Sequence, residues 1–272
     1  MENFINNAPF ALVLVALVIG FVLLIKGADY FVEGSSSIAK KLKVPPIIIG
    51  LTIVAMGTSL PETAVSVTAS LVQNNELAVS NVVGSNIFNL MVVVGVCSIL
   101  TPILVQKETI KRDIPFSMIC AFLLLGLGIL AVGDKIGMRL GHLDGIIMLG
   151  FFAGYIVAMI RSAMKARAAG INVEIEGIEE LEEEIGILSW PKSILFIVGG
   201  AFAIAFGGDL TVDAASRIAI DLGMSQTLVG LTIVSIGTSL PELVTSVVAA
   251  RKNEVDMAVG NAVGSNIFNI LM

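Results

Sequence analysis

The sequence predicts an all-α, polytopic membrane protein built from two inverted repeats. Of its 272 residues, 56% are apolar and only 14% are charged, and the mean hydropathy is +0.95. Soluble globular domains usually have about 45–50% apolar and about 25% charged residues. Apolar stretches long enough to cross a bilayer as helices recur along the chain. One six-residue motif occurs twice, which indicates the duplication.

Eight apolar segments are expected to be transmembrane helices, with Gly and Pro residues at most of their ends and breaks. In chain order they are about 9–32, 45–71, 77–100, 114–132, 143–160, 190–210, 225–250 and 257–272. Gly34 ends the first segment. Gly57 and Pro61 break the second, and Gly237 and Pro241 break the seventh. The first seven residues contain no basic side chain, so the first segment is expected to be retained rather than removed as a signal peptide.

The repeat is the strongest signal in the sequence. The stretch from Gly57 to Glu62 reads Gly-Thr-Ser-Leu-Pro-Glu and recurs 180 residues later, from Gly237 to Glu242. Gly-Ser-Asn-Ile-Phe-Asn at 84–89 recurs at 264–269. The repeated unit contains five predicted helices, an odd number, so corresponding helices run in opposite directions. This predicts an inverted-topology repeat with a shared site near the bilayer midplane.

Loop charges bear on the topology, because cytoplasmic loops carry most Lys and Arg residues. With the N-terminus outside, the outside loops hold three basic residues, Lys135, Arg139 and Arg217. The inside loops hold twelve, namely Lys40, Lys41, Lys43, Lys107, Lys111, Arg112, Arg161, Lys165, Arg167, Lys192, Arg251 and Lys252. The sequence therefore predicts a plasma-membrane protein with an outside N-terminus.

The repeat also divides the chain. Residues 1–165 are expected to form the first half, with helices one to five, and residues 189–272 the second half, with helices six to eight. By the repeat, two further helices would follow, so a truncated chain is expected, with a natural fragment as the alternative. Residues 166–188 are expected to form a cytoplasmic linker, with seven glutamates between 174 and 184. A solvated linker is the expectation, and a weak Ca²⁺ sensor without EF-hand spacing is the alternative.

Each motif places a carboxylate, Glu62 or Glu242, inside an apolar segment, where an ionisable group indicates a functional site. Pro61 has no N–H, so the carbonyl four residues earlier loses its helical partner. Thr58 and Ser59 precede Glu62 by four and three residues and share its helical face. These oxygens suit Ca²⁺ or Na⁺. A helix kink in which Glu is only a cap is the alternative, and the duplication argues against it.

Glu62 and Glu242 together supply two negative charges, which one Ca²⁺, two Na⁺ or two protons neutralise. Binding of Ca²⁺ and of the driving ion is then mutually exclusive, which is the physical basis of antiport. Ser85 and Asn89, four residues apart in the third segment, extend the set of oxygens. Four further asparagines are expected to cap broken helices or bond across helices, with ion binding as the alternative for the first and third: Asn81, Asn86, Asn261 and Asn266.

Other functions have less support in the sequence. His142, the single histidine, lies in a predicted loop, and Cys97 and Cys120 lie in apolar segments without metal-type spacing. No nucleophile–base pair or cofactor loop is evident, so an enzyme is not expected. The basic residues are scattered over short loops, so no nucleic-acid partner is expected either. The oligomeric state is left open.

With these motifs, the chain resembles the cation/calcium exchanger superfamily and is similar to its prokaryotic sodium/calcium exchangers over essentially its whole length. The resemblance implies ten helices around four ion sites, with the first and sixth segments sliding to switch access. The implied Ca²⁺ ligands are Glu62 and Glu242 with the backbone oxygens of Thr58 and Thr238. The implied Na⁺ ligands are side chains or carbonyls of Ala55, Thr58, Ser59, Ser85, Ser235, Thr238, Ser239 and Ser265.

Asn269 departs from the family pattern, because several relatives have Asp there, whereas here Asn89 and Asn269 are both amides. The central site has one carboxylate fewer, which leaves the ion stoichiometry and the driving ion open. The expected function is exchange of Ca²⁺ for Na⁺ across the lipid bilayer by alternating access. H⁺/Ca²⁺ antiport is the alternative within transport. A cation channel or a non-transporting membrane sensor is the alternative from another class.

Overall fold

The computed structural model describes residue 5 and residues 7–71, 75–130, 140–168, 187–229, 232–233 and 235–272. All regular elements among them are helices, so the all-α prediction is confirmed. Five of these helices are long and apolar enough to cross a membrane, and a sixth span results if the bent pair 46–58 and 60–71 is counted as one. The count of eight spans stays a prediction. The acidic stretch at 174–184 lies outside the described residues.

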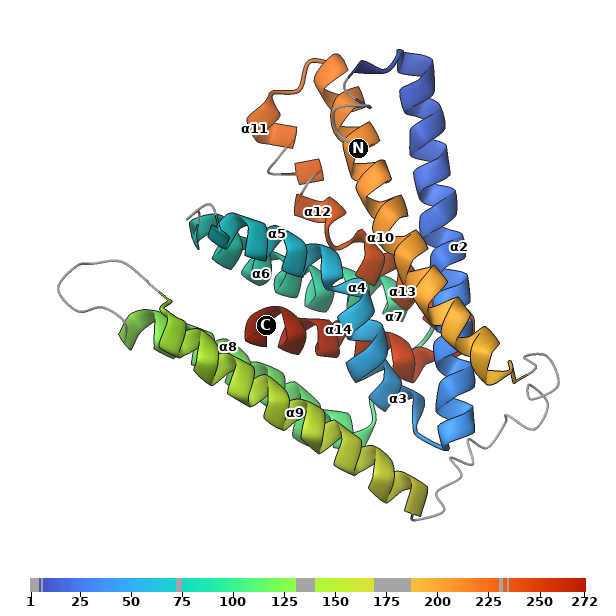
Figure 1. Ribbon diagram of the computed structural model, residues 1–272, viewed down its shortest axis with the longest axis vertical. Coiled ribbons are helices and arrows are strands. Elements are labelled where there is room, and N and C mark those ends of the chain that lie inside the picture. The colour runs from blue at the N-terminus through green and yellow to red at the C-terminus, as the bar shows by residue number, and fades with distance from the viewer. Residues whose placement is uncertain are drawn as a thin grey trace.

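The first half contains most of the helices (Figure 1). They are α2 (Phe10–Leu42), α3 (Pro46–Ile49), the π-helix η1 (Gly50–Val54), α4 (Ala55–Thr58), α5 (Leu60–Leu71), α6 (Asn75–Phe88), the π-helix η2 (Asn89–Val93), α7 (Val94–Leu100), the π-helix η3 (Thr109–Asp113), α8 (Ile114–Leu130) and α9 (His142–Ala168). The second half contains α10 (Trp190–Asp221), α11 (Gln226–Val229), α12 (Ser235–Gly237), α13 (Leu240–Arg251) and α14 (Val255–Leu271). The bend between the α3–α4 part and α5 measures 48° and lies beside Pro61.

Two helices run further than the sequence indicated. α2 continues through Gly34 to Leu42, and α10 continues beyond residue 210 to Asp221. The predicted end of the first segment was wrong, because Gly34 does not end the helix but allows α2 to pack closely against α10. A Cβ at Gly34 would lie 2.8 Å from the carbonyl oxygen of Ser193 in α10, so only glycine lets the two backbones approach.

α2 and α10 cross each other and form one side of the molecule (Figure 1). Their contact uses repeat-related glycines in exchanged pairs. A Cβ at Gly27 would lie 3.0 Å from the Gly200 carbonyl oxygen, and a Cβ at Gly207 would lie 2.8 Å from the Gly20 carbonyl oxygen. Gly20 and Gly27 precede Gly200 and Gly207 by 180 residues. The first helices of the two repeats therefore pack together about a local two-fold axis.

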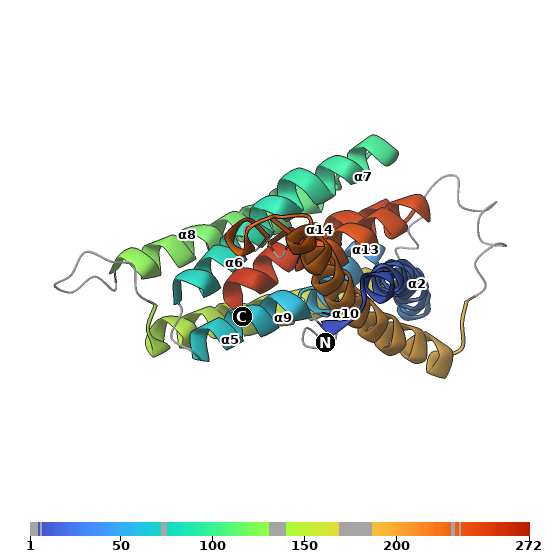
Figure 2. The ribbon, with the colours of Figure 1, turned by 90° about the horizontal axis from the view of Figure 1, so that it is seen from above.

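α14 lies in the interior, between the α8–α9 pair and the α2–α10 pair (Figures 1 and 2). Every residue from Met257 to Leu271 is buried, and α14 packs on α3, η1, α8, α9 and α13. Its counterpart α6 has the same Gly-Ser-Asn-Ile-Phe-Asn sequence but exposes Val83 and Ile87. The difference arises from tertiary packing, because α8 and α9 cover α14.

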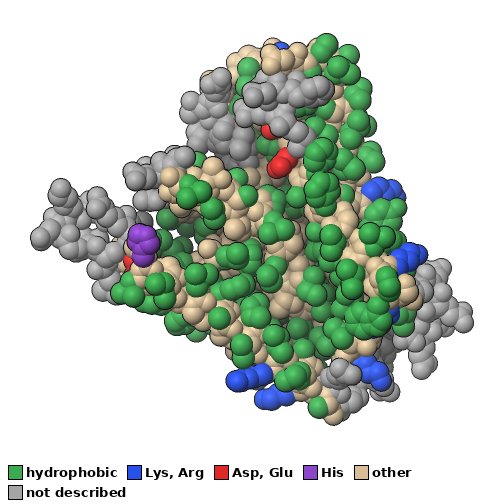
Figure 3. Space-filling model, viewed as in Figure 1, with side chains coloured by type: hydrophobic (Ala, Val, Ile, Leu, Met, Phe, Trp, Pro, Cys, Tyr) green, Lys and Arg blue, Asp and Glu red, His purple; other side chains and the backbone are tan. Residues whose placement is uncertain are grey.

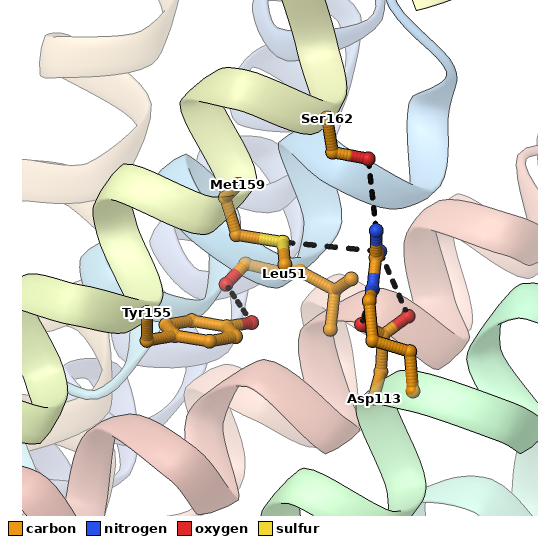
Figure 4. Close-up of polar contacts among 6 residues, drawn as sticks. Leu51, Asp113, Tyr155, Met159 and Ser162 are labelled. Carbon is orange, nitrogen blue, oxygen red and sulfur yellow. Dashed lines mark hydrogen bonds and ion pairs between the residues drawn. The ribbon is translucent and has the colours of Figure 1, made fainter. Parts of the chain in front are cut away.

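Polar contacts join α9 to η1 and to the turn that precedes α8 (Figure 4). The hydroxyl of Tyr155 in α9 donates to the carbonyl oxygen of Leu51 in η1 at 3.2 Å. Arg112 forms an ion pair with the buried Asp113, at 2.7 Å, and donates to Ser162 at 2.8 Å. The Leu51 carbonyl lies in a π-helical turn, whose backbone hydrogen bonds depart from the α-helical pattern, and Tyr155 provides it with a donor from α9.

The outer surface suits a lipid environment. Hydrophobic side chains cover most of the face in Figure 3, and most of its Lys and Arg side chains lie at the lower and right-hand margins. Large apolar side chains are exposed along the outer helices, for example Val18 at 62%, Phe122 at 66% and Phe202 at 71%. Exposed apolar surface on this scale would be unfavourable in water and is expected for helices that face lipid.

Candidate ion-binding site

Glu62 and Glu242 begin the helices that follow the two breaks. Each lies in the first turn of its helix, α5 or α13, directly after Pro61 or Pro241. The positive end of the helix dipole lies there and favours a negative charge. Both side chains are buried, with exposed fractions of 1% and 0%. Two carboxylates in such surroundings require a cation or protons for compensation.

The glutamates are joined by crossed hydrogen bonds between the two repeats. Ser59 Oγ donates to Glu242 Oε1 at 2.8 Å, and Ser239 Oγ donates to Glu62 Oε1 at 3.2 Å. Both serines are fully buried. The fold therefore brings the two motifs into direct contact, and each half supplies a hydroxyl to the carboxylate of the other.

Asn81 and Asn261 bind the backbone of the two glutamates. Each amide nitrogen donates to the carbonyl oxygen of the glutamate in its own repeat, at 3.1 and 3.4 Å, and to a serine hydroxyl, Ser66 or Ser246, at 3.0 or 2.9 Å. The Oδ1 atom of Asn261 also accepts the Thr58 hydroxyl at 3.0 Å. These contacts across helices favour the supporting role over ion binding for Asn261, since both ends of its amide have partners.

The other asparagines form a second set of crossed contacts. Asn86 Nδ2 and Asn266 Nδ2 each donate to the backbone carbonyl of the other residue at 3.2 Å. Asn89 Nδ2 donates to Asn266 Oδ1 at 3.1 Å, and Asn269 Nδ2 donates to Asn86 Oδ1 at 3.4 Å. The local two-fold relation thus extends from the motifs to α6 and α14.

Nine buried side-chain oxygens have no hydrogen-bond partner within the described residues, and five of these belong to the two glutamates or to the two Gly-Ser-Asn-Ile-Phe-Asn segments. These five are Glu62 Oε2, Glu242 Oε2, Ser85 Oγ, Asn89 Oδ1 and Asn269 Oδ1. A buried polar atom without a partner destabilises a fold by about 1–3 kcal/mol, and by more when the group is charged. Carboxylate, hydroxyl and amide oxygens are hard ligands, so their chemistry fits Ca²⁺ or Na⁺. In the described part of the chain, no group of three or more His, Cys, Asp or Glu residues gathers in one place.

The remaining predicted ligands lie in the same region, with two restrictions. Thr58 Oγ1 lies 3.5 Å from Ser265 Oγ, which joins the first motif to α14. The Ala55 carbonyl already accepts the Ser59 N–H at 3.0 Å. The side chain of Ser235 lies outside what the structure describes. Ion binding by any of these residues stays a prediction.

Two cavities reach the motifs. The larger, of about 170 Å³, extends from Glu62 along the α5 hydroxyl groups of Thr63, Ser66 and Ser70 and is also lined by Asn269. The smaller, of about 130 Å³, separates α10 from the breaks, and its polar lining residues are Asp209, Asp213 and Thr238. The larger cavity therefore places three hydroxyl groups and one amide beside Glu62, among apolar lining residues.

The sequence did not indicate a role for Tyr155, whose hydroxyl donates to the carbonyl oxygen of Leu51 in η1. Leu51 lies four residues before the predicted ligand Ala55. Tyr155 lies outside the repeated motifs, and its ring stacks on Phe116 in an otherwise apolar pair of helices. No local pattern indicates a hydrogen bond between α9 and a distant π-helical carbonyl. Only the tertiary arrangement reveals this contact.

Comparison with known proteins places these observations in one family. The family model described as "Sodium/calcium exchanger protein" matches residues 12–161 and 192–272. The protein CaxA of Alkalimonas amylolytica is 41% identical over 257 residues, which cover 94% of this chain and 76% of CaxA. The sodium/calcium exchanger MaX1 of Methanosarcina acetivorans is 36% identical over 279 residues, which cover 94% of this chain and 79% of MaX1.

Solved structures agree with the sequence comparison. The sodium-calcium exchanger NCX_Mj, soaked with 2.5 mM Na⁺ and 0.1 mM Ca²⁺, aligns with a TM-score of 0.77 and 32% identity. The alignment covers 95% of this chain and 79% of NCX_Mj. The match of the family model, the relatives over most of their length and the shared fold lead to one conclusion: this chain belongs to the sodium/calcium exchanger family.

Proposed function

We propose that the chain is a plasma-membrane antiporter that exchanges Ca²⁺ for Na⁺ by alternating access at the paired motifs. The observation that carries the proposal is the pair of buried carboxylates, Glu62 and Glu242, linked by crossed serine hydrogen bonds. Each glutamate keeps one oxygen without a hydrogen-bond partner in the described structure. MaX1 and NCX_Mj are sodium/calcium exchangers by name, which supports the same substrates here.

The charge of the pair explains why exchange is coupled. Two carboxylates in apolar surroundings are stable only when about two positive charges accompany them, whether one Ca²⁺, two Na⁺ or two protons. An ion-free site is therefore costly, and the protein exchanges one set of cations for another rather than crossing empty. Asn89 and Asn269 are uncharged amides, so the charge of the site stays at two carboxylates.

The test is Ca²⁺ flux in proteoliposomes at a clamped membrane potential. Glu62→Gln and Glu242→Gln each remove one charge while keeping the size of the side chain, and each is expected to abolish Na⁺-driven Ca²⁺ uptake. Ser98→Ala, in an exposed part of α7, is the matched control and should transport normally. Normal flux in both glutamine variants would overturn the proposal.

H⁺/Ca²⁺ antiport is the second candidate, because protons can also neutralise the buried pair. In that case a pH gradient would drive Ca²⁺ uptake at constant Na⁺, and a Na⁺ gradient at constant pH would not. A channel predicts flux without any counter-ion. A sensor built on the acidic linker predicts that deletion of residues 174–184 removes all function, whereas an exchanger keeps its flux.

A further inference from the structure

The turn between α13 and α14 is bonded to α2 at two places. Lys252 Nζ lies 3.3 Å from Asp29 Oδ1 and donates to the Asp29 carbonyl oxygen at 3.0 Å. The Ser36 hydroxyl, almost two turns further along α2, donates to the Glu254 carboxylate. These contacts involve neither the motifs nor the oxygens assigned above to the ions. They fasten a helix of the α2–α10 pair to the turn that precedes the buried α14.

The repeat allows a comparison with the opposite end of the molecule. The α2 positions are duplicated, because Asp29 and Ser36 correspond to Asp209 and Ser216 of α10. Their partners are not duplicated. At the positions that correspond to Lys252 and Glu254, the sequence has the uncharged residues Val72 and Asn74. In agreement, the buried Ser216 Oγ has no hydrogen-bond partner within the described residues.

The packing shows the same asymmetry. α2 packs along α13, where Phe31 and Val32 join Val248 and Ala249 in one apolar cluster. On the repeat-related side, the cavity of about 130 Å³ separates α10 from the start of α5 and is lined by Val212, the counterpart of Val32. The contacts of α2 with the α13–α14 turn therefore lie on the packed side of the site, and the cavity lies on the side where the sequence lacks the charged partners.

We propose that Lys252 and Glu254, with Asp29 and Ser36, form a latch that closes access to the ion site on the side of the α13–α14 turn, which the predicted topology places in the cytoplasm. The proposal rests on the proposed function, because only alternating access requires this side to open. The latch must release in each transport cycle. At the opposite end the corresponding positions are Val72 and Asn74, which carry neither the lysine nor the carboxylate, so the outward-open arrangement is favoured when the latch is closed.

Side-specific accessibility tests the proposal in the full chain, reconstituted in proteoliposomes after Cys97 and Cys120 are replaced by Ala. Val212→Cys reports on the open cavity, and Val32→Cys reports on the packed counterpart. The double substitution Lys252→Met with Glu254→Gln should raise the labelling rate of Val32→Cys by a membrane-impermeant maleimide. The expected increase is about tenfold or more, because the two substitutions remove one partly exposed ion pair and one hydrogen bond to a charged group.

Lys26→Met is the matched control. Lys26 also lies near Asp29, at 3.5 Å, but both residues belong to α2, so their ion pair joins no two elements. Its removal should leave both labelling rates unchanged. In the reverse direction, Val72→Lys with Asn74→Glu supplies the missing partners to α10 and should lower the labelling of Val212→Cys. Equal effects of Lys26→Met and of the latch variant would overturn the proposal.

Cross-linking distinguishes a moving latch from a fixed structural contact. Ser36→Cys and Glu254→Cys, joined by a short bifunctional thiol reagent with a cleavable centre, should stop Ca²⁺ flux, and cleavage should restore it. Full flux in the cross-linked protein would overturn the latch but leave the exchanger proposal intact. Retained flux in Glu62→Gln and Glu242→Gln would instead overturn the proposed function, so the two failures are distinguishable.

Discussion

At the scale of single residues, each glutamate depends on a hydroxyl from the opposite repeat. A hydrogen bond to a charged group contributes about 1.5–3 kcal/mol. Ser59→Ala and Ser239→Ala should therefore each weaken apparent Ca²⁺ affinity by roughly tenfold or more. The two variants should behave alike, because the contacts are related by the local two-fold axis. The measurement is the Ca²⁺ dependence of uptake into proteoliposomes.

Affinity that falls in neither variant would contradict the crossed arrangement. Ser98→Ala is again a suitable comparison, because the Ser98 hydroxyl donates within its own helix to the Val94 carbonyl, at an exposed position. An effect of that substitution as large as the effect of Ser59→Ala would indicate a general response to serine loss rather than a local one.

Tyr155 provides a second residue-scale prediction. Tyr155→Phe keeps the ring that stacks on Phe116 but removes the hydrogen bond to the Leu51 carbonyl in η1. Loss of this buried hydrogen bond should cost about 0.5–1.5 kcal/mol, so the melting temperature in detergent should fall. Tyr30→Phe is the control, because Tyr30 is 47% exposed. An unchanged melting temperature for Tyr155→Phe would contradict a structural role for this bond.

The sequence predicted the proximity of the glutamates better than the details around them. Exact duplication of Gly-Thr-Ser-Leu-Pro-Glu in an apolar context, with an odd number of predicted helices in each repeat, predicted a shared site. The crossed partners of Ser59 and Ser239 do not follow from spacing, since either serine could bond within its own repeat. The contact of Tyr155 also has no signal in the sequence, because it joins residues 104 positions apart through tertiary packing alone.

At the scale of elements, the crossing of α2 and α10 depends on the glycines that lie at the contact between the two helices, and not on glycines elsewhere in α10. In Gly200→Ala, the new Cβ would lie 2.8 Å from both the Gly27 carbonyl oxygen and the Phe31 nitrogen. Because both close atoms belong to the backbone of α2, neither can move away from the new methyl group without shifting the helix. The free energy of unfolding should therefore fall by about 1–3 kcal/mol, as in other overpacked interiors. Thermal unfolding in detergent measures the change.

The neighbouring Gly199 is a matched control. A Cβ at Gly199 meets nothing within 4 Å. Gly199→Ala should therefore leave the protein unchanged or stabilise it by about 0.5–1 kcal/mol, because alanine favours a helix interior over glycine. If both alanine variants unfold at the same temperature, close approach is not the reason for Gly200.

Helix type and approximate position could be predicted, but several helix ends could not. Apolar length and the Gly and Pro residues located the segments. The same rules ended the first segment at Gly34, where α2 instead continues, because packing against α10 overrides a local breaker. The π-helices Gly50–Val54 and Asn89–Val93 also lacked a signal, since a π-turn depends on which carbonyls find other partners.

At the scale of the whole molecule, the predicted orientation is open to direct test. The distribution of Lys and Arg places the N-terminus outside and the start of α10 inside. A membrane-impermeant thiol reagent should label Ser189→Cys only in inside-out vesicles and Gly141→Cys only in intact cells. Both positions are exposed, and the native cysteines are buried. The reverse pattern would invert the side on which the latch closes.

The crossed serine–glutamate bonds have a consequence for the origin of the fold. In this chain each carboxylate takes its hydroxyl partner from the other half, so a polypeptide of half this length would lack both crossed contacts. Two such polypeptides would regain them by pairing as an antiparallel homodimer, which needs copies inserted in both directions. A chain that joins two copies holds one copy in each direction and allows their two turns to differ.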